Sequence, residues 1–189
     1  MTDSLTQRLN EILPKVISTG FLSGKGLGNE IAFYIFDYPP EAELRIREHI
    51  QFLMTHIPNN RPGLRAKHIN LFDLIVDHLR ERNLLEKSFQ MQRDKGDKAI
   101  EKALGGPLKA EKLVQIFEGV ARPEEQDLVL VSGVGSVWPL VRSHNLLNNL
   151  QTVMGQTPLV MFYPGRYDGQ ALRLFGKIKS NNYYRAFRL

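Results

Sequence analysis

The sequence contains no cysteine among its 189 residues, and it has no long apolar run. Without cysteine, neither a disulfide framework nor thiolate chemistry is possible. No apolar stretch approaches the roughly 20 residues that a membrane-spanning helix needs, and the polar N-terminal segment lacks the apolar core of a secretory signal. These absences predict a soluble, cytoplasmic protein that makes no membrane contact.

Nucleotide-binding motifs are present only as fragments. The segment from Gly20 to Gly26 resembles the phosphate-binding motif G-x-x-x-x-G-K-[ST]. It is one residue short between its glycines, lacks Ser or Thr after Lys25, and follows a helical pattern where the motif needs a strand. These departures favour a helix cap and a turn. We therefore expect no nucleotide cofactor at this segment.

Other catalytic and metal-binding patterns are also incomplete. The G-x-G that begins at Gly133 follows an apolar run, but Trp138 stands where the dinucleotide fingerprint needs glycine. His49 and His56 are seven residues apart, which is too far for a chelating pair on one helix. Ser132 lacks the preceding glycine of a nucleophile elbow. We predict no catalytic, cofactor-binding or metal-binding residue, and no enzymatic activity.

Five apolar runs alternate with helical patterns along the chain. They lie near residues 30–38, 67–71, 127–135, 157–165 and 182–189. The third run is apolar nearly throughout, which is typical of a strand buried on both faces of a parallel sheet. This alternation predicts a single α/β domain over residues 1–189, with a mostly parallel sheet of about five strands covered by helices. By analogy alone, such a sheet resembles a degenerate P-loop or Rossmann-like fold.

The segments between the strands are predicted to be helical, beginning with a helix from Glu41 to about His56 and one that follows the second strand directly. Residues 86–118 are rich in charge and form a helical excursion within the domain, interrupted at Gly105, Gly106 and Pro107. A helix is expected from Pro139 to Met154, and a short one over residues 170–178.

Polar side chains and glycines follow the ends of several predicted strands. In an open parallel sheet the carboxyl ends share one edge, where ligands usually bind. The residues expected at that edge are Asp37, Ser132, Gly133, Gly135, Tyr163, Gly165 and Arg166, with Arg142 within reach from the next helix. Two interpretations stay open. The group is either a binding cleft or a structural network in which Asp37 and arginines pin the loops.

The excess positive charge lies at one end of the chain. Six basic residues and one acidic residue fall between Gly165 and Leu189, while the remainder has 19 of each sign. A basic end on a neutral body can face nucleic acid or an acidic protein surface, although Lys and Arg also protect an edge strand from aggregation. The candidate partner-binding residues are Arg173, Lys177, Lys179, Tyr183, Tyr184, Arg185, Phe187 and Arg188.

Several long strings make a family resemblance specific. They are "GLGNEIAFYIFDYPP", "LVSGVGSVWPLVRSHNLLNNLQ", "TPLVMFYPGRYDGQALRLF" and "NNYYRAFRL". Together they resemble the BrxB family of small proteins, which belong to the BREX bacteriophage-exclusion systems of bacteria and archaea. The resemblance runs from about Leu22 to Leu189, and residues 86–118 carry none of the strings.

The resemblance implies a component of an anti-phage defence island. Such islands also encode a large ATPase, an adenine-specific DNA methyltransferase and the phosphatase-like protein PglZ, and the chemistry is expected in those partners. The family has no catalytic motif that could be transferred to this sequence. The leading hypothesis is therefore a non-enzymatic adaptor that binds other BREX proteins, PglZ above all. A DNA-contacting subunit that uses the basic segment, and a ligand-binding or enzymatic domain that uses the cleft, remain as alternatives.

Overall fold

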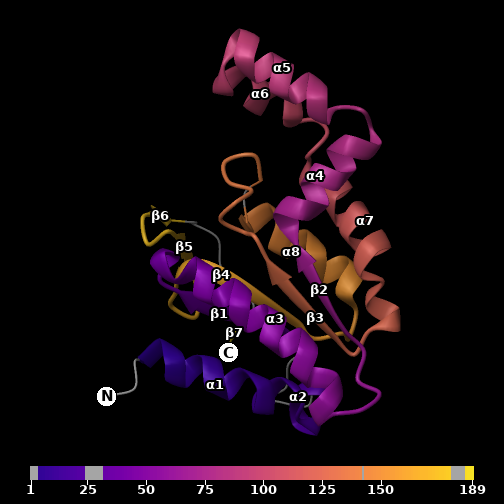
Figure 1. Cartoon of the computed structure of the whole chain (residues 1–189), viewed down its shortest axis with the longest axis vertical. Coiled ribbons are helices and arrows are strands. Elements are labelled where there is room, and N and C mark those ends of the chain that lie inside the picture. Colours follow the sequence, from indigo (N-terminus) through magenta and orange to yellow (C-terminus); the bar gives the residue numbers. More distant parts are fainter. Residues whose placement is uncertain (1–3, 24–31, 142, 180–185) are drawn as a thin grey trace.

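A parallel sheet with helices on both faces forms the body of the protein (Figure 1). The computed structural model describes residues 4–23, 32–141, 143–179 and 186–189. The five parallel strands are β1 (Phe33–Tyr38), β2 (Ala66–Asn70), β3 (Leu128–Ser132), β4 (Leu159–Tyr167) and β7 (Phe187–Arg188). β1 to β4 coincide with the first four apolar runs, and β7 lies within the fifth, of which residues 182–185 lie outside the described residues. The predicted α/β class and parallel sheet are confirmed.

The strand order is β2-β3-β4-β1-β7. β1 lies inside the sheet and pairs with β4 along its whole length, from Phe33 opposite Leu159 to Tyr38 opposite Pro164. In the dinucleotide-binding fold the first two strands are neighbours, whereas here β2 and β1 are separated by two strands. The likeness to a P-loop sheet stays a hypothesis.

One face of the sheet is covered by α1 (Ser4–Val16) and α3 (Glu43–Asn60). Each helix has an apolar stripe at helical spacing, which packs on the sheet. The buried residues of the two stripes are Leu5, Leu9, Ile12 and Val16 in α1, and Ile46, Ile50, Leu53 and Ile57 in α3. The short helices α2 (Thr19–Leu22) and η1 (Pro40–Ala42) precede β1 and α3.

The other face is covered by α4 (Leu71–Glu81), α7 (Ala110–Ala121) and α8 (Ser143–Met154). All five residues of β3, between the two layers, are buried, as its continuous apolar run predicts. α8 begins at Ser143, later than the predicted Pro139, because most of residues 133–141 form turns after β3. In the described segments, no helix is both long and apolar enough to cross a membrane.

The segment between α4 and α7 forms an arm. It consists of α5 (Leu85–Lys95) and α6 (Asp97–Leu104), which project beyond the body (Figure 1). The only buried residue of α5 is Ser88, and the only one of α6 is Leu104. α7 then returns to the sheet, and the 3-10 helix η2 (Pro123–Glu125) leads into β3.

The predicted helix over residues 170–178 is wrong. This segment forms two short antiparallel strands, β5 (Leu172–Leu174) and β6 (Ile178–Lys179), beside the end of β4. The turn between β4 and β5 is fixed by Asp168, whose Oδ1 accepts hydrogen bonds from the backbone N–H groups of Gln170 and Ala171 at 3.0 and 2.7 Å. Such bonds from an Asp side chain occur both at helix starts and in Asx turns; here the turn leads directly into the strand β5.

Candidate functional site

β1 and β4 are neighbouring strands, and at their carboxyl ends the helices that connect the strands change from one face of the sheet to the other. The connection from β1 runs through α3 on one face, whereas α4, α7 and α8 lie on the other. In open α/β sheets, a crevice at such a switch point is the usual ligand site. Asp37 lies at this point, near the end of β1 and opposite Tyr163 of β4.

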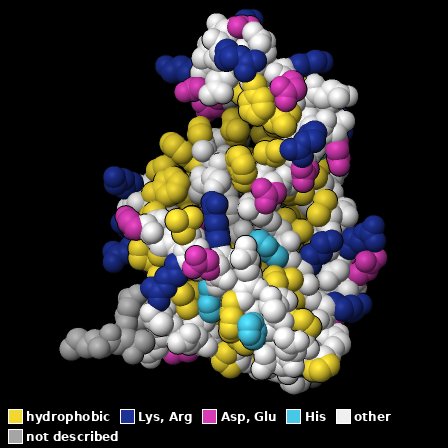
Figure 2. Space-filling view, viewed as in Figure 1, with side chains coloured by type: hydrophobic (Ala, Val, Ile, Leu, Met, Phe, Trp, Pro, Cys, Tyr) yellow, Lys and Arg dark blue, Asp and Glu magenta, His cyan; other side chains and the backbone are white. Residues whose placement is uncertain are grey.

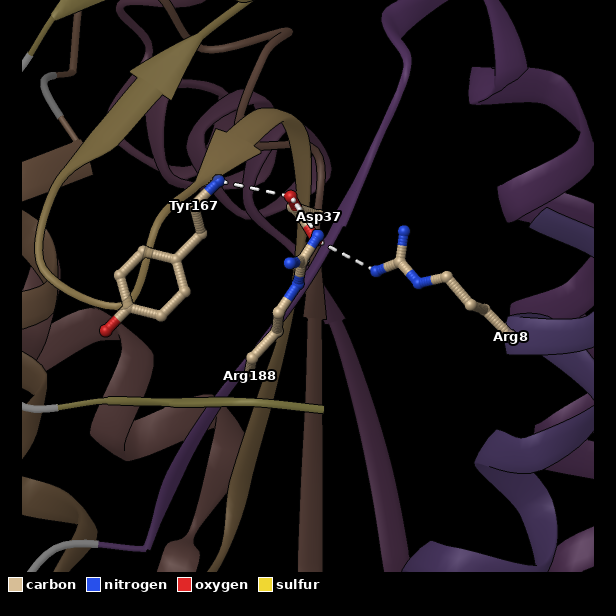
Figure 3. A network of polar contacts seen from close by, with 4 residues as sticks. All are labelled: Arg8, Asp37, Tyr167 and Arg188. Carbon is tan, nitrogen blue, oxygen red and sulfur yellow. Dashed lines mark hydrogen bonds and ion pairs between the residues drawn. The ribbon is translucent and has the colours of Figure 1, made fainter. Parts of the chain in front are cut away.

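The carboxylate of Asp37 is buried and surrounded by donors (Figure 3). Its Oδ1 accepts hydrogen bonds from Arg8 Nη2 at 2.8 Å and from Arg188 Nε and Nη2 at 3.2 and 3.0 Å. Its Oδ2 accepts from Arg188 Nη2 and from the backbone N–H of Tyr167, both at 3.1 Å. The side chain of Asp37 is 5% exposed, against 31% for Arg8 and 58% for Arg188. One buried anion therefore lies between two partly solvated cations.

The network fastens the final strand to the sheet. Arg188 belongs to β7, and the backbone N–H of Leu189 donates to the carbonyl of Ile35 in β1 at 2.9 Å. The ring of Phe187 packs against Tyr34 at 5.9 Å between centroids. The Tyr167 hydroxyl donates to the carbonyl of Ala186 at 2.7 Å. A strand of only two residues is therefore held by side chains from β1 and β4 as well as by its backbone.

Arg8 belongs to the Asp37 network, although the sequence analysis did not identify it as a site residue. It lies on α1, and its guanidinium group also sits 4.5 Å from the centre of the Phe36 ring. A helix pattern shows which residues face the sheet, but it does not show which strand end a long side chain reaches. Of the predicted cleft arginines, Arg166 is exposed and is not among the groups that contact Asp37, and Arg142 lies outside the described residues.

The predicted cleft residues of β3 and β4 are mainly buried. Tyr163 is 1% exposed and Ser132 is 5% exposed. A Cβ atom on Gly133 would lie 2.2 Å from Asn70 Oδ1, and one on Gly165 would lie 2.1 Å from the carbonyl oxygen of Arg173. These glycines therefore allow the end of β2 and the strand β5 to approach the chain closely. Gly135 is only partly buried and faces Phe175 and Pro164.

Ser132 forms a hydrogen bond with a histidine on the neighbouring strand. His68 Nε2 and Ser132 Oγ are 2.8 Å apart, and burial lowers the pKa of His68. A nucleophile and its base can meet at this distance. However, a nucleophile must also reach its substrate, and the burial of Ser132 favours a structural hydrogen bond between β2 and β3.

A second polar contact follows Asp37 directly. The Tyr38 hydroxyl donates to Glu43 Oε2 at 2.5 Å, and Arg47 Nε donates to Glu43 Oε1 at 3.0 Å. Burial, followed by the hydrogen bond to Glu43, raises the pKa of Tyr38, so the phenol stays protonated at neutral pH. This contact joins the end of β1 to the first turn of α3.

The loop after β1 is poorly suited to hold phosphate. A phosphate cradle needs successive backbone N–H groups, usually presented by glycines. Here Pro39 and Pro40 follow Tyr38, and proline has no backbone N–H. Across residues 4–23, 32–141, 143–179 and 186–189, no group of three or more His, Asp or Glu side chains could hold a metal ion.

The predicted partner-binding residues divide into three groups. Arg173 and Lys177 are exposed on the β4–β5–β6 hairpin, and Lys179 lies in β6. Phe187 and Arg188 take part in holding β7. Tyr183, Tyr184 and Arg185 lie outside the described residues.

The fold and this edge define an α/β protein whose switch point is occupied by its own ion pairs. The family model described as "BREX protein BrxB" matches residues 67–189. A BREX protein BrxB of Bacillus cereus (strain H3081.97) is 43% identical over 189 residues, covering 98% of this chain and 97% of that protein. A BREX protein BrxB of Escherichia coli O9:H4 (strain HS) is 42% identical over 185 residues, covering 98% and 91%.

This chain belongs to the BrxB family of BREX systems, which are anti-phage defence systems. The resemblance drawn from the four sequence strings is confirmed. No solved structure matches the chain.

The Asp37 network can be tested through stability. Asp37→Ala leaves two guanidinium groups without their carboxylate and the buried N–H of Tyr167 without its acceptor. We expect the free energy of unfolding to fall by about 2–4 kcal/mol, below the full cost of breaking a wholly buried pair because both arginines reach solvent. Urea unfolding at neutral pH measures this change.

Asp77→Ala is the matched control. Asp77 pairs with Arg80 on the exposed surface of α4, where an ion pair contributes at most about 0.5 kcal/mol. Equal losses of stability in the two variants would show that Asp37 is no more important than a surface carboxylate.

Proposed function

We propose that this chain is a non-enzymatic adaptor of a BREX defence complex, and that its direct partner is the phosphatase-like PglZ. The methyltransferase and the ATPase are further candidates for contact within the same complex. The observation that supports this proposal best is the use of the switch-point crevice for the chain's own ion pairs. A protein that acts through chemistry at this edge would need an open site there, whereas an adaptor needs only outer surfaces.

The alternative of an enzymatic or ligand-binding domain has weaker support. Its central residue, Asp37, already accepts five hydrogen-bond contacts from protein groups. A ligand at this position would have to displace an arginine or the N–H of Tyr167. The loop that would hold its phosphate contains two prolines.

We therefore expect the protein neither to bind Mg-ATP at micromolar concentration nor to hydrolyse it. The reason is the missing run of N–H donors after β1, together with the shortened glycine loop around Lys25. Isothermal titration calorimetry with Mg-ATP measures binding, and phosphate release measures hydrolysis. Micromolar binding that is abolished by Lys25→Ala would contradict the adaptor proposal.

The α5–α6 arm offers a surface for a protein partner. Phe89 of α5 is a large apolar side chain, and it is 44% exposed. The helix around it buries only Ser88, so nothing in α5 covers the Phe89 ring completely. Hydrophobic side chains gather where the arm joins the body, and charged side chains of both signs cover its tip (Figure 2). An apolar centre with a polar rim is the usual composition of a protein–protein contact.

A groove lies beside this region. It has a volume of about 670 Å³ and runs between the α6–α7 connection and the turns after β3. Leu108 and Leu140 give it apolar walls, and Lys109 and Glu111 add charge. Trp138, which precedes the groove-lining Pro139, is 43% exposed. Large aromatic side chains of this kind often anchor protein interfaces.

The adaptor proposal predicts that Phe89→Ser weakens binding to PglZ at least tenfold, which is about 1.4 kcal/mol. The fold should be retained because Phe89 is largely outside the core. Phe52→Ser on α3 is the matched control, because Phe52 is 42% exposed but lies on the opposite face of the sheet. Biolayer interferometry with immobilised PglZ measures both affinities, and circular dichroism checks folding.

Three results would count against this surface. These are full affinity of the Phe89→Ser variant, equal loss in both variants, and failure of the wild-type chain to bind PglZ.

Arg188 should not be used as a charge-reversal probe, because a carboxylate there would face Asp37 and disturb the fold. An apolar interface should also keep its affinity as salt rises, unlike a contact with phosphates.

A further inference from the structure

Two arginines stand side by side on the β4–β5–β6 hairpin. Arg166 of β4 is directly opposite Arg173 of β5 in the antiparallel register, and both are exposed. Side chains in such positions have Cβ atoms about 4.5–5.5 Å apart. Arg173 is in turn opposite Lys179 of β6. The register therefore places three basic positions in a row across the hairpin.

In the part of the chain that the structure describes, no carboxylate forms an ion pair with Arg166 or Arg173. Asp168 is the acidic residue of the hairpin, and its Oδ1 accepts hydrogen bonds from the backbone of the turn. These bonds first, and the nearby charge of Arg173 to a lesser degree, lower the pKa of Asp168, but the two side chains form no ion pair. Like charges directly opposite each other destabilise a strand pair. The hairpin keeps this arrangement, which suggests that its counterion comes from a partner.

The opposite side of the hairpin is apolar and faces the core. Tyr167, Leu172 and Leu174 are all buried. On the outward face, the two arginines are direct neighbours with no apolar residue between them. This face therefore lacks the apolar centre that a protein–protein interface usually has. Lys177, in the turn that follows β5, adds another exposed cation. Several Lys and Arg side chains are visible on the side of the molecule where β5 and β6 lie (Figure 2).

We propose that this arginine face, formed by Arg166, Arg173 and the adjoining Lys177, binds the phosphodiester backbone of duplex DNA. Phosphates supply closely spaced anions without requiring an apolar contact, and each guanidinium group can donate two parallel hydrogen bonds to a phosphate. Contacts to the backbone carry no sequence information, so the binding is independent of sequence. This role goes beyond the adaptor function and does not depend on PglZ.

The test is fluorescence anisotropy with a labelled 30-base-pair duplex of arbitrary sequence, titrated with the full chain over a range of salt concentrations. The double variant Arg166→Gln, Arg173→Gln should bind at least tenfold more weakly in low salt. Its plot of log affinity against log salt concentration should be less steep by about two, because each phosphate contact contributes about 0.9 to the slope. Both residues are exposed, so the variant should keep the wild-type circular dichroism spectrum.

The control is the double variant Arg82→Gln, Arg93→Gln, which removes the same charge from exposed positions of the α4 end and α5. It should bind DNA nearly as the wild type does. Equal weakening in both double variants would show attraction by net charge alone and would overturn the proposal. So would no binding by the wild-type chain in low salt. Unchanged DNA affinity with lost PglZ affinity in the Arg166, Arg173 variant would instead assign this face to an acidic protein surface.

Discussion

The buried carboxylate of Asp37 joins parts of the chain that lie far apart in the sequence. Arg8 comes from the first helix, Tyr167 from the end of β4, and Arg188 from the final strand. A buried carboxylate is unfavourable unless it is paired and hydrogen-bonded. Its donors must therefore stay in place, and α1, β4 and β7 stay with them. The two-residue strand β7 depends on this constraint most, because its backbone alone pairs with β1 over a very short length.

The same constraint affects what the sheet edge can do. Asp37 lies at the switch point, where open α/β sheets usually bind ligands, and the surrounding groups satisfy it. The space beside Gly133 and Gly165 is filled by residues of the neighbouring strands β2 and β5. The surfaces available to partners then lie further out, on the α5–α6 arm and on the β4–β5–β6 hairpin. These are separate elements, so the proposed protein contact through the arm and the proposed DNA contact through the hairpin are compatible within one chain.

The sequence predicted the sheet well because buried parallel strands are continuous apolar runs. β3 and the first part of β4 are such runs, and they stand out from the amphipathic helices between them. Strand order could not be predicted, because every buried strand has a similar composition. The error over residues 170–178 arose from a three-residue strand, which is too short to show alternation clearly. Asp168-Gly169, a common hairpin signal, could have indicated the turn.

The candidate site was predicted in part. Position at the end of an apolar run was enough to single out Asp37 as a residue of the sheet edge. Its partners could not be derived in the same way, because Arg8 is 29 residues away and Arg188 is 151 residues away. Such pairings depend on how helices and strands pack, which one sequence does not encode as a local pattern. Arg188 appeared in the sequence only as part of a basic segment, where its charge suggested a partner and gave no sign of Asp37.

Native-state hydrogen exchange tests most directly whether Asp37 locks the sheet edge. The amide of Tyr167 donates to Asp37, and the amide of Leu189 donates to Ile35 beside it. If the network is intact in solution, both amides should exchange at least about a thousandfold more slowly than in an unstructured peptide, since they open only with the surrounding sheet. Both should lose this protection in Asp37→Ala, which removes the acceptor of Tyr167 and the anion between the arginines, while the amides of β3 keep most of theirs. Fast exchange at Tyr167 and Leu189 in the wild-type protein, or protection that Asp37→Ala leaves unchanged, would contradict the account.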